Sequence, residues 1–98
     1  MAARMNFPKI DLDGVGIRVE AVSLSSGMTD GEFARSVDID PSSFSKIVQG
    51  KKPLNADMGF RISERWDVSM DYLYRGRLTG TSEKVIYMLR KIENSRLG

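Results

Sequence analysis

The sequence predicts an all-α fold, and three of its features lead to that prediction. Apolar residues recur at a spacing of three or four in six separate stretches, as they do on one face of a helix. Polar capping residues precede most of these stretches, and glycines follow several of them. Two of the six are short and lie close together within residues 27–50. The other helices are expected to pack around these two, the central pair.

The start of each helix of the central pair has a recognisable capping pattern. Thr29 is followed three residues later by Glu32, which is the spacing of a capping box. Asp40 followed by Pro41 is typical of a helix start, because proline at the first helical position loses no hydrogen bond there. The sequence therefore predicts one helix from about residue 30 and another from residue 41.

A short turn at residues 37–40 separates the two helices. Ala34 provides the small side chain that a close helix crossing needs, and Ile39 is expected to fill the crevice between the helices. Short hydroxyls, one amide and one cation are left on the outward face of the second helix. Such a surface suits base edges and phosphates, with an ordinary solvated helix face as the alternative. These outward residues are Ser42, Ser43, Ser45, Lys46 and Gln49.

Length and composition restrict the class of protein. A chain of 98 residues is expected to form a single domain. The absence of Cys and His excludes disulfides and most zinc sites, and it removes the usual bases that activate a nucleophile. We therefore expect no metal, no cofactor and no enzymatic activity. No apolar run approaches a membrane span or a signal peptide, so a cytoplasmic protein is expected.

Charge is distributed unevenly along the chain, although the net charge is only +2. Residues 1–45 contain four Lys or Arg against seven Asp or Glu, and residues 46–98 contain eleven against six. A basic excess of this kind favours a polyanionic partner, although basic solvated surfaces are common. The excess begins with Lys46, Lys51, Lys52, Arg61 and Arg65.

Before the central pair, the sequence predicts an arm and one helix. Residues 1–13 are expected to form the arm, because Pro8 and a cluster of Asp and Gly residues oppose a continuous helix. A helix is expected at residues 15–26, ended by Gly27. Its apolar residues occupy two adjacent faces, so it should be mostly buried, with Leu24 on the buried side.

After the central pair, two helices are predicted at residues 56–66 and 70–74, each opened by a polar cap. Trp66 has the helical spacing of a core residue, whereas Arg61 should face water. Tyr72 is expected to be half-exposed.

A linker and a last helix are predicted within residues 78–98, the helix at about residues 83–95. The helix has an apolar stripe that either folds back on the domain or pairs with a second chain. We expect it to form the interface of a homodimer, because monomers rarely leave such a face exposed. The stripe consists of Val85, Met88, Leu89 and Ile92.

From Val15 to Gly76 the sequence resembles the XRE/Cro, or lambda-repressor-like, helix-turn-helix family. Members of that family have five helices in this order. The similar motifs are Gly27-Met28-Thr29 before the second helix, Phe33-Ala34, Ile39, Phe44, Ile47, Gln49-Gly50-Lys51, and Val68-Ser69-Met70-Asp71-Tyr72-Leu73.

The resemblance implies a five-helix DNA-binding domain at residues 14–77, with an additional C-terminal helix. The implied function is sequence-specific binding of double-stranded DNA by a transcriptional regulator, a small repressor acting as a dimer on a palindromic operator. Two lysines after the second helix of the pair would neutralise phosphates. The candidate DNA-binding residues are Thr29, Ser42, Ser43, Ser45, Lys46, Gln49, Lys51 and Lys52.

The chain departs from the family at several positions. Asp38 and Asp67 replace glycines in left-handed turns, a conformation that Asp tolerates better than most residues. Asp30 replaces a glutamine that often binds phosphate, so that contact is not transferred to this chain. Ser23 and Val48 stand where relatives often have a buried Arg–Glu pair, and both charges are absent together.

Two other functions remain open. An antitoxin of the same fold would bind a toxin partner as well as its own operator, and the last helix would be the toxin-binding element. A protein-interaction module of this fold would lack DNA binding, and a salt series on a polyanion column would distinguish it.

Overall fold

The computed structural model describes residues 6–97 of the chain. Over this range the chain has six α-helices and no strand, which confirms the all-α prediction. The predicted arm before residue 6 lies outside the described residues. The helices are α1 (Leu12–Ser26), α2 (Asp30–Ser36), α3 (Pro41–Val48), α4 (Ala56–Trp66), α5 (Met70–Arg75) and α6 (Glu83–Leu97).

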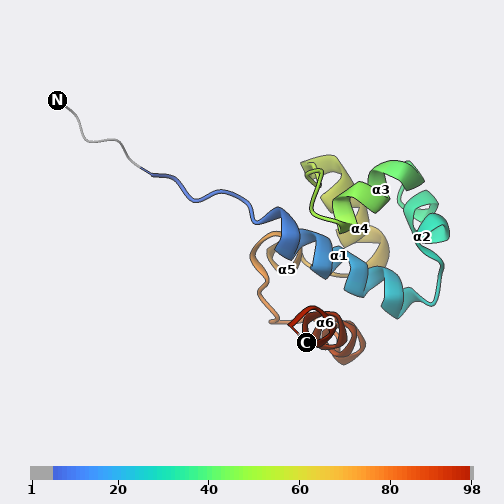
Figure 1. Cartoon of the computed structure of the whole chain (residues 1–98). Helices are drawn as coiled ribbons and strands as arrows, with labels where there is room; N and C mark the ends of the chain where they lie inside the picture. Colours follow the sequence, from blue (N-terminus) through green and yellow to red (C-terminus); the bar gives the residue numbers. More distant parts are fainter. Residues whose placement is uncertain (1–5, 98) are drawn as a thin grey trace.

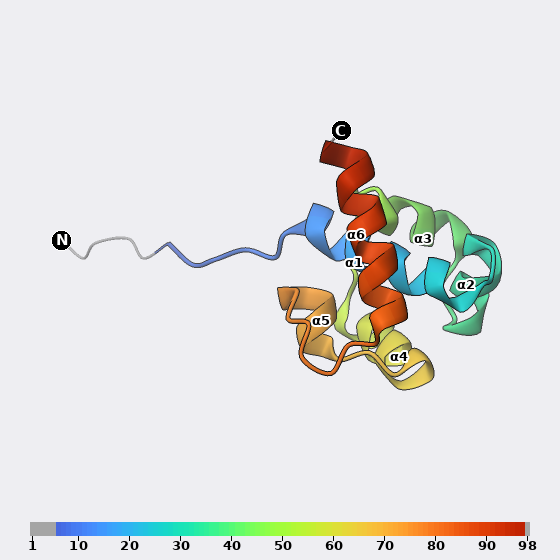
Figure 2. The same cartoon turned by 90° about the horizontal axis from the view of Figure 1, so that it is seen from below.

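Helix α1 lies at the centre of the fold (Figure 1). It contacts α2, α3, α5 and α6. In Figure 1, α3 lies above α1 and α6 lies below it, and the view turned by 90° shows α6 crossing α1 (Figure 2). The central helix therefore separates α6 from α3.

The boundaries of α1 and α6 differ from the prediction by two residues or more, and α5 ends one residue later than predicted, at Arg75. Helix α1 begins at Leu12, so the predicted arm of residues 1–13 is too long and Gly14 lies inside the helix. Asp11 takes the cap position, and its carbonyl oxygen accepts the first helical hydrogen bond at 3.0 Å, which closes the first turn in spite of the glycine. Helix α6 continues to Leu97, beyond its predicted end.

The helices enclose one hydrophobic core, and two burial predictions fail there. Tyr72 is fully buried rather than half-exposed, because its hydroxyl donates a hydrogen bond of 2.8 Å to the Arg18 carbonyl oxygen and so keeps a polar partner. Leu24 is 44% exposed, so the apolar face of α1 is not covered over its full width. Trp66 packs against the core as predicted, with its ring stacked on Phe33 at a centroid distance of 5.4 Å.

Helices α1 and α3 touch through their backbones at Gly16. A Cβ atom at this position would lie 2.6 Å from the carbonyl oxygens of both Ile47 and Val48. Real Cβ atoms do not approach backbone oxygens so closely, so only glycine fits without moving one helix. The absence of a side chain at Gly16 therefore sets how near α3 lies to α1.

Helix α6 folds back on its own chain. Val85, Leu89 and Ile92 are buried, and Met88 is half-buried against the core. The Arg96 guanidinium forms an ion pair with a carboxylate of α1 at 3.3 Å. Of the two alternatives for this stripe, the structure therefore shows the fold-back on the same chain. The reason given for a dimer through these four residues, an apolar face that the domain does not cover, does not apply. The apolar stripe of α6 is buried because it packs on α1.

Gly16→Ala should lower the free energy of unfolding by about 1–3 kcal/mol, because the new methyl group meets two backbone oxygens that no rotamer change can move. Gly31→Ala is the matched control. Its Cβ meets only the flexible Arg35 side chain, at 3.5 Å, so it should gain up to about 1 kcal/mol from helix propensity. Urea unfolding of both variants measures the free energy of unfolding, which should fall in Gly16→Ala and rise in Gly31→Ala. A Gly16→Ala variant as stable as Gly31→Ala would contradict the backbone contact.

Leu89→Asp should lower the free energy of unfolding by about 3 kcal/mol or more, because it replaces a buried apolar side chain packed on α1 by a carboxylate. Tyr87→Asp is the control, since Tyr87 lies two residues away and is 60% exposed; its effect should stay within about 0.5 kcal/mol. Thermal melts at several protein concentrations provide the measurement. If Leu89→Asp melts like Tyr87→Asp, α6 does not pack on its own chain as described.

Candidate nucleic-acid interface

The N-termini of α2 and α3 are capped as the sequence predicts. In α2, the Thr29 hydroxyl accepts from the Glu32 N–H at 3.2 Å, and the Glu32 carboxylate accepts from the Thr29 N–H at 2.9 Å. That backbone N–H also holds the pKa of Glu32 below its usual value. In α3, the Asp40 carboxylate accepts from the N–H groups of Ser42 and Ser43 at 3.1 and 3.2 Å. Both helices are therefore fixed at their first turn.

Asp40 has a second role at the start of α3. The Ser42 hydroxyl donates to its carboxylate at 2.9 Å. This bond and the Ser43 N–H hold the pKa of Asp40 below its usual value. The carboxylate at the tip of α3 is thus occupied by the helix itself and keeps its negative charge.

The turn between α2 and α3 has the features that the sequence predicts. Asp38 is left-handed, with φ of 55°, and Asp67 after α4 has φ of 54°. Ile39 is 2% exposed and fills the crevice between the helices, and Ala34 is fully buried in α2. Because the turn is short and its apolar residue is buried, the position of α3 relative to α2 is strongly restricted.

Arg61 of α4 contacts the same turn, which the sequence did not indicate. Its Nε donates to the Val37 carbonyl oxygen at 2.7 Å and its Nη2 to the Asp38 carbonyl oxygen at 3.2 Å. The prediction that Arg61 faces water is therefore wrong. The guanidinium satisfies two backbone oxygens that a left-handed turn leaves without helical partners.

A serine and an aspartate join α1 to α2. Ser23 is fully buried, and its hydroxyl donates to an Asp30 carboxylate oxygen at 2.8 Å. The sequence identifies Asp30 only as a residue in place of the family's phosphate-binding glutamine. It identifies Ser23 only as an uncharged residue where relatives often have a buried charge. A buried hydroxyl near a helix-opening carboxylate is the signal that would have suggested this pair.

The predicted binding residues of α3 form one polar face. Phe44 and Ile47 are buried and hold the helix on the core. On the opposite side, Ser42, Ser45, Lys46 and Gln49 are exposed and Ser43 is half-buried. Lys51 and Lys52 follow in the exposed loop, and Thr29 is exposed at the cap of α2.

Several of these polar groups are already bonded to one another. The Gln49 side-chain amide donates to the Ser45 hydroxyl at 2.9 Å, and the Lys52 ammonium donates to the Ser43 hydroxyl at 2.9 Å. The second bond places the loop after α3 beside the first turn of α3. Among residues 6–97, Lys46 forms no ion pair with a carboxylate, and neither does Lys51. The face thus offers ordered hydroxyls with unpaired cations beside them.

Comparison with known protein families, curated proteins and solved structures gives no match for this chain. The part of the chain that the structure describes contains no helix long and apolar enough to cross a membrane. An assignment of function therefore depends on the geometry of the site.

Arg61→Ala should lower the free energy of unfolding by about 1.5–3 kcal/mol, because two carbonyl oxygens of the turn lose a charged donor. It should also speed hydrogen exchange at the start of α3. Arg65→Ala is the control: Arg65 is exposed one turn later on α4 and contacts the Trp66 ring at 5.2 Å. Equal exchange rates in the two variants would show that Arg61 does not restrain the turn.

Proposed function

We propose that the chain is a sequence-specific regulator that binds double-stranded DNA, a small repressor with a lambda-repressor-like helix-turn-helix. One observation carries the proposal. Helix α3 follows a capped helix and a short restrained turn, and it presents an exposed face of hydroxyls, an amide and the Lys46 cation, with two more lysines in the loop that follows. A helix held on the core by one face and polar on the other is what major-groove docking requires.

In the proposed complex, α3 enters the major groove with its N-terminus first. Ser42 and Ser43 lie at base edges or nearby phosphates, and Lys46 reaches a guanine or the backbone. Lys51 and Lys52 neutralise phosphates and so position the domain without reading sequence. Asp40 is a negative group at the leading end of α3, so its charge must stay away from phosphates.

Short side chains limit direct readout, so DNA shape contributes to specificity in this proposal. One domain also offers few base contacts, and a two-fold dimer on a palindromic site would double them. The apolar stripe of α6 is buried on α1 within the chain. The dimer would therefore use another surface of the domain.

No observation favours the antitoxin alternative. That function assigns toxin binding to the last helix, whose apolar residues Val85, Leu89 and Ile92 are already covered. A protein-interaction module without DNA binding differs from a repressor in a measurable way, because only binding to DNA releases counterions and weakens steeply with salt.

Selection from random duplexes provides a preferred site, and fluorescence anisotropy measures binding to it. Lys46→Ala should cost about 1–3 kcal/mol and relax the preference at one base position. Lys51→Ala should weaken all duplexes alike and reduce the salt slope by about one. Lys84→Ala, an exposed cation on α6, is the control and should change neither. Unchanged affinity in both the Lys46 and Lys51 variants would refute the proposed docking.

A further inference from the structure

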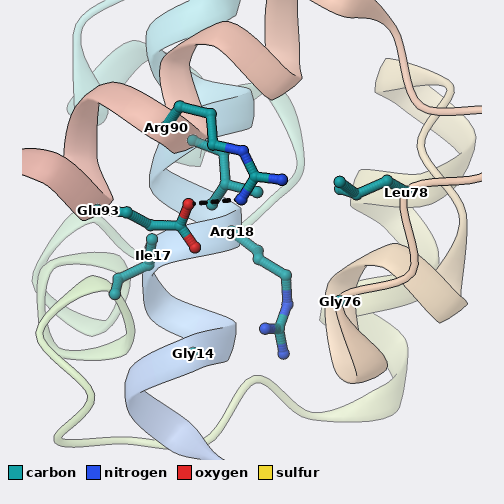
Figure 3. A pocket seen from close by; sticks show the side chains of 8 residues that line it. Gly14, Ile17, Arg18, Gly76, Leu78, Arg90 and Glu93 are labelled. Carbon is teal, nitrogen blue, oxygen red and sulfur yellow. Dashed lines mark hydrogen bonds and ion pairs between the residues drawn. The ribbon is translucent and has the colours of Figure 1, made fainter.

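A crevice of about 170 Å³ lies between α1, the segment after α5, and α6 (Figure 3). Its apolar wall is formed by Ile17, Leu78 and Leu89, and charged side chains reach it from α1 and α6. It lies on the α6 side of α1, whereas α3 packs on the other side (Figure 1). A ligand in this crevice would not compete with a ligand of α3.

Arg18 of α1 is a half-buried cation in this crevice. Its Nε donates to the Leu73 carbonyl oxygen at 2.9 Å, which fixes the plane of the guanidinium. Within residues 6–97, its two terminal nitrogens have no hydrogen-bond or ion-pair partner. In Figure 3 the guanidinium points down between Gly14 and Gly76. Four N–H donors on an oriented fork are therefore available.

Both glycines keep the space beside this guanidinium open. A Cβ at Gly14 would lie 2.7 Å from an Asp11 carboxylate oxygen and 3.0 Å from Arg18 Nη1, and a Cβ at Gly76 would lie 3.1 Å from Arg18 Nη1. Gly76 also has φ of 76°, which disfavours other residues. A side chain at either position would crowd the terminal nitrogens.

The charges around Arg18 leave it without a close counterion. Glu93 faces it from α6, but Arg90 holds that carboxylate in an ion pair of 2.8 Å (Figure 3). The Asp11 carboxylate approaches from the start of α1 without forming an ion pair. Burial lowers the pKa of the Arg18 guanidinium, and Tyr72, Asp11 and Glu93 only partly oppose that effect. A partly desolvated cation gains from an anion that reaches it directly.

We propose that this crevice binds a small organic monocarboxylate, with its carboxylate on the terminal nitrogens of Arg18 and its apolar body on Ile17, Leu78 and Leu89. The planar guanidinium fork matches a carboxylate in shape as well as charge. The volume is about that of a cavity that holds one benzene ring, so the body is a single ring or a short branched chain. Any second carboxylate on the ligand would be repelled by Glu93 and Asp11, which selects a monoanion.

The proposed ligand would bridge α1, the segment after α5 and α6. Each of these elements contributes one part of the site: Arg18 from α1, Leu78 from the segment, and Leu89 from α6. Binding would therefore stabilise the folded-back position of α6. This inference does not depend on the proposed DNA binding, since it uses no residue of α3.

Benzoate is a suitable probe, and benzamide is its neutral counterpart of nearly equal shape. Titration of the full chain with benzoate, followed by amide NMR, should give saturable shifts at Gly14, Arg18, Gly76 and Leu78. A Kd of about 1 mM is expected for so small a ligand. Benzamide should bind at least about tenfold more weakly, because it lacks the charge that Arg18 recognises. No saturation below about 10 mM, shifts centred elsewhere, or equal binding of benzamide would each overturn the proposal.

Two variants test separately how the apolar wall and the cation contribute to benzoate binding. Leu78→Trp fills the crevice and leaves Arg18 in place, and Arg18→Lys keeps the charge but removes the fork; each should weaken benzoate at least about tenfold. Arg77→Ala removes an exposed neighbouring cation that does not line the crevice, and it should leave the Kd unchanged. Unaltered binding in Leu78→Trp would overturn the proposal even if Arg18→Lys failed to fold.

Discussion

The backbone contact between Gly16 and the last turn of α3 determines where the polar face of α3 lies. Because a Cβ at Gly16 would be 2.6 Å from two carbonyl oxygens, α1 and α3 approach more closely than side-chain packing allows. Helix α1 also contacts α2, α5 and α6. Because α3 packs on α1, this one helix sets the position of α3 relative to the rest of the core.

Side-chain hydrogen bonds further restrict the position of α3. Ser23 joins α1 to α2 through Asp30, and Arg61 joins α4 to the turn before α3. Neither contact lies on the outward face of α3, yet each restricts its position. A surface held from three other helices loses little conformational freedom when it binds, so more of the contact energy appears as affinity. The lysines beside it then act on a surface that is already ordered.

Sequence reasoning predicted what depends on neighbouring residues and missed what depends on distant ones. The caps of Thr29 and Asp40 were predictable because donor and acceptor lie within three residues of each other. The Arg61 contact joins residues 24 apart, and no local pattern indicates it. The apolar stripe of α6 indicated correctly that a face is buried, but a stripe does not specify its partner, which is α1 in the same chain. Tyr72 was misjudged for the same reason, since the carbonyl oxygen that accepts its hydroxyl lies 54 residues away.

The hydrogen bonds within the polar face of α3 have a thermodynamic consequence. The Gln49 amide and the Lys52 ammonium already donate to serine hydroxyls at 2.9 Å. A ligand of this face must exchange these bonds for its own, so the number of hydrogen bonds changes little and the net enthalpy gained is small. For a polyanion, the remaining driving force is the release of condensed ions, which is entropic. Association at this surface would then respond strongly to ionic strength and weakly to temperature.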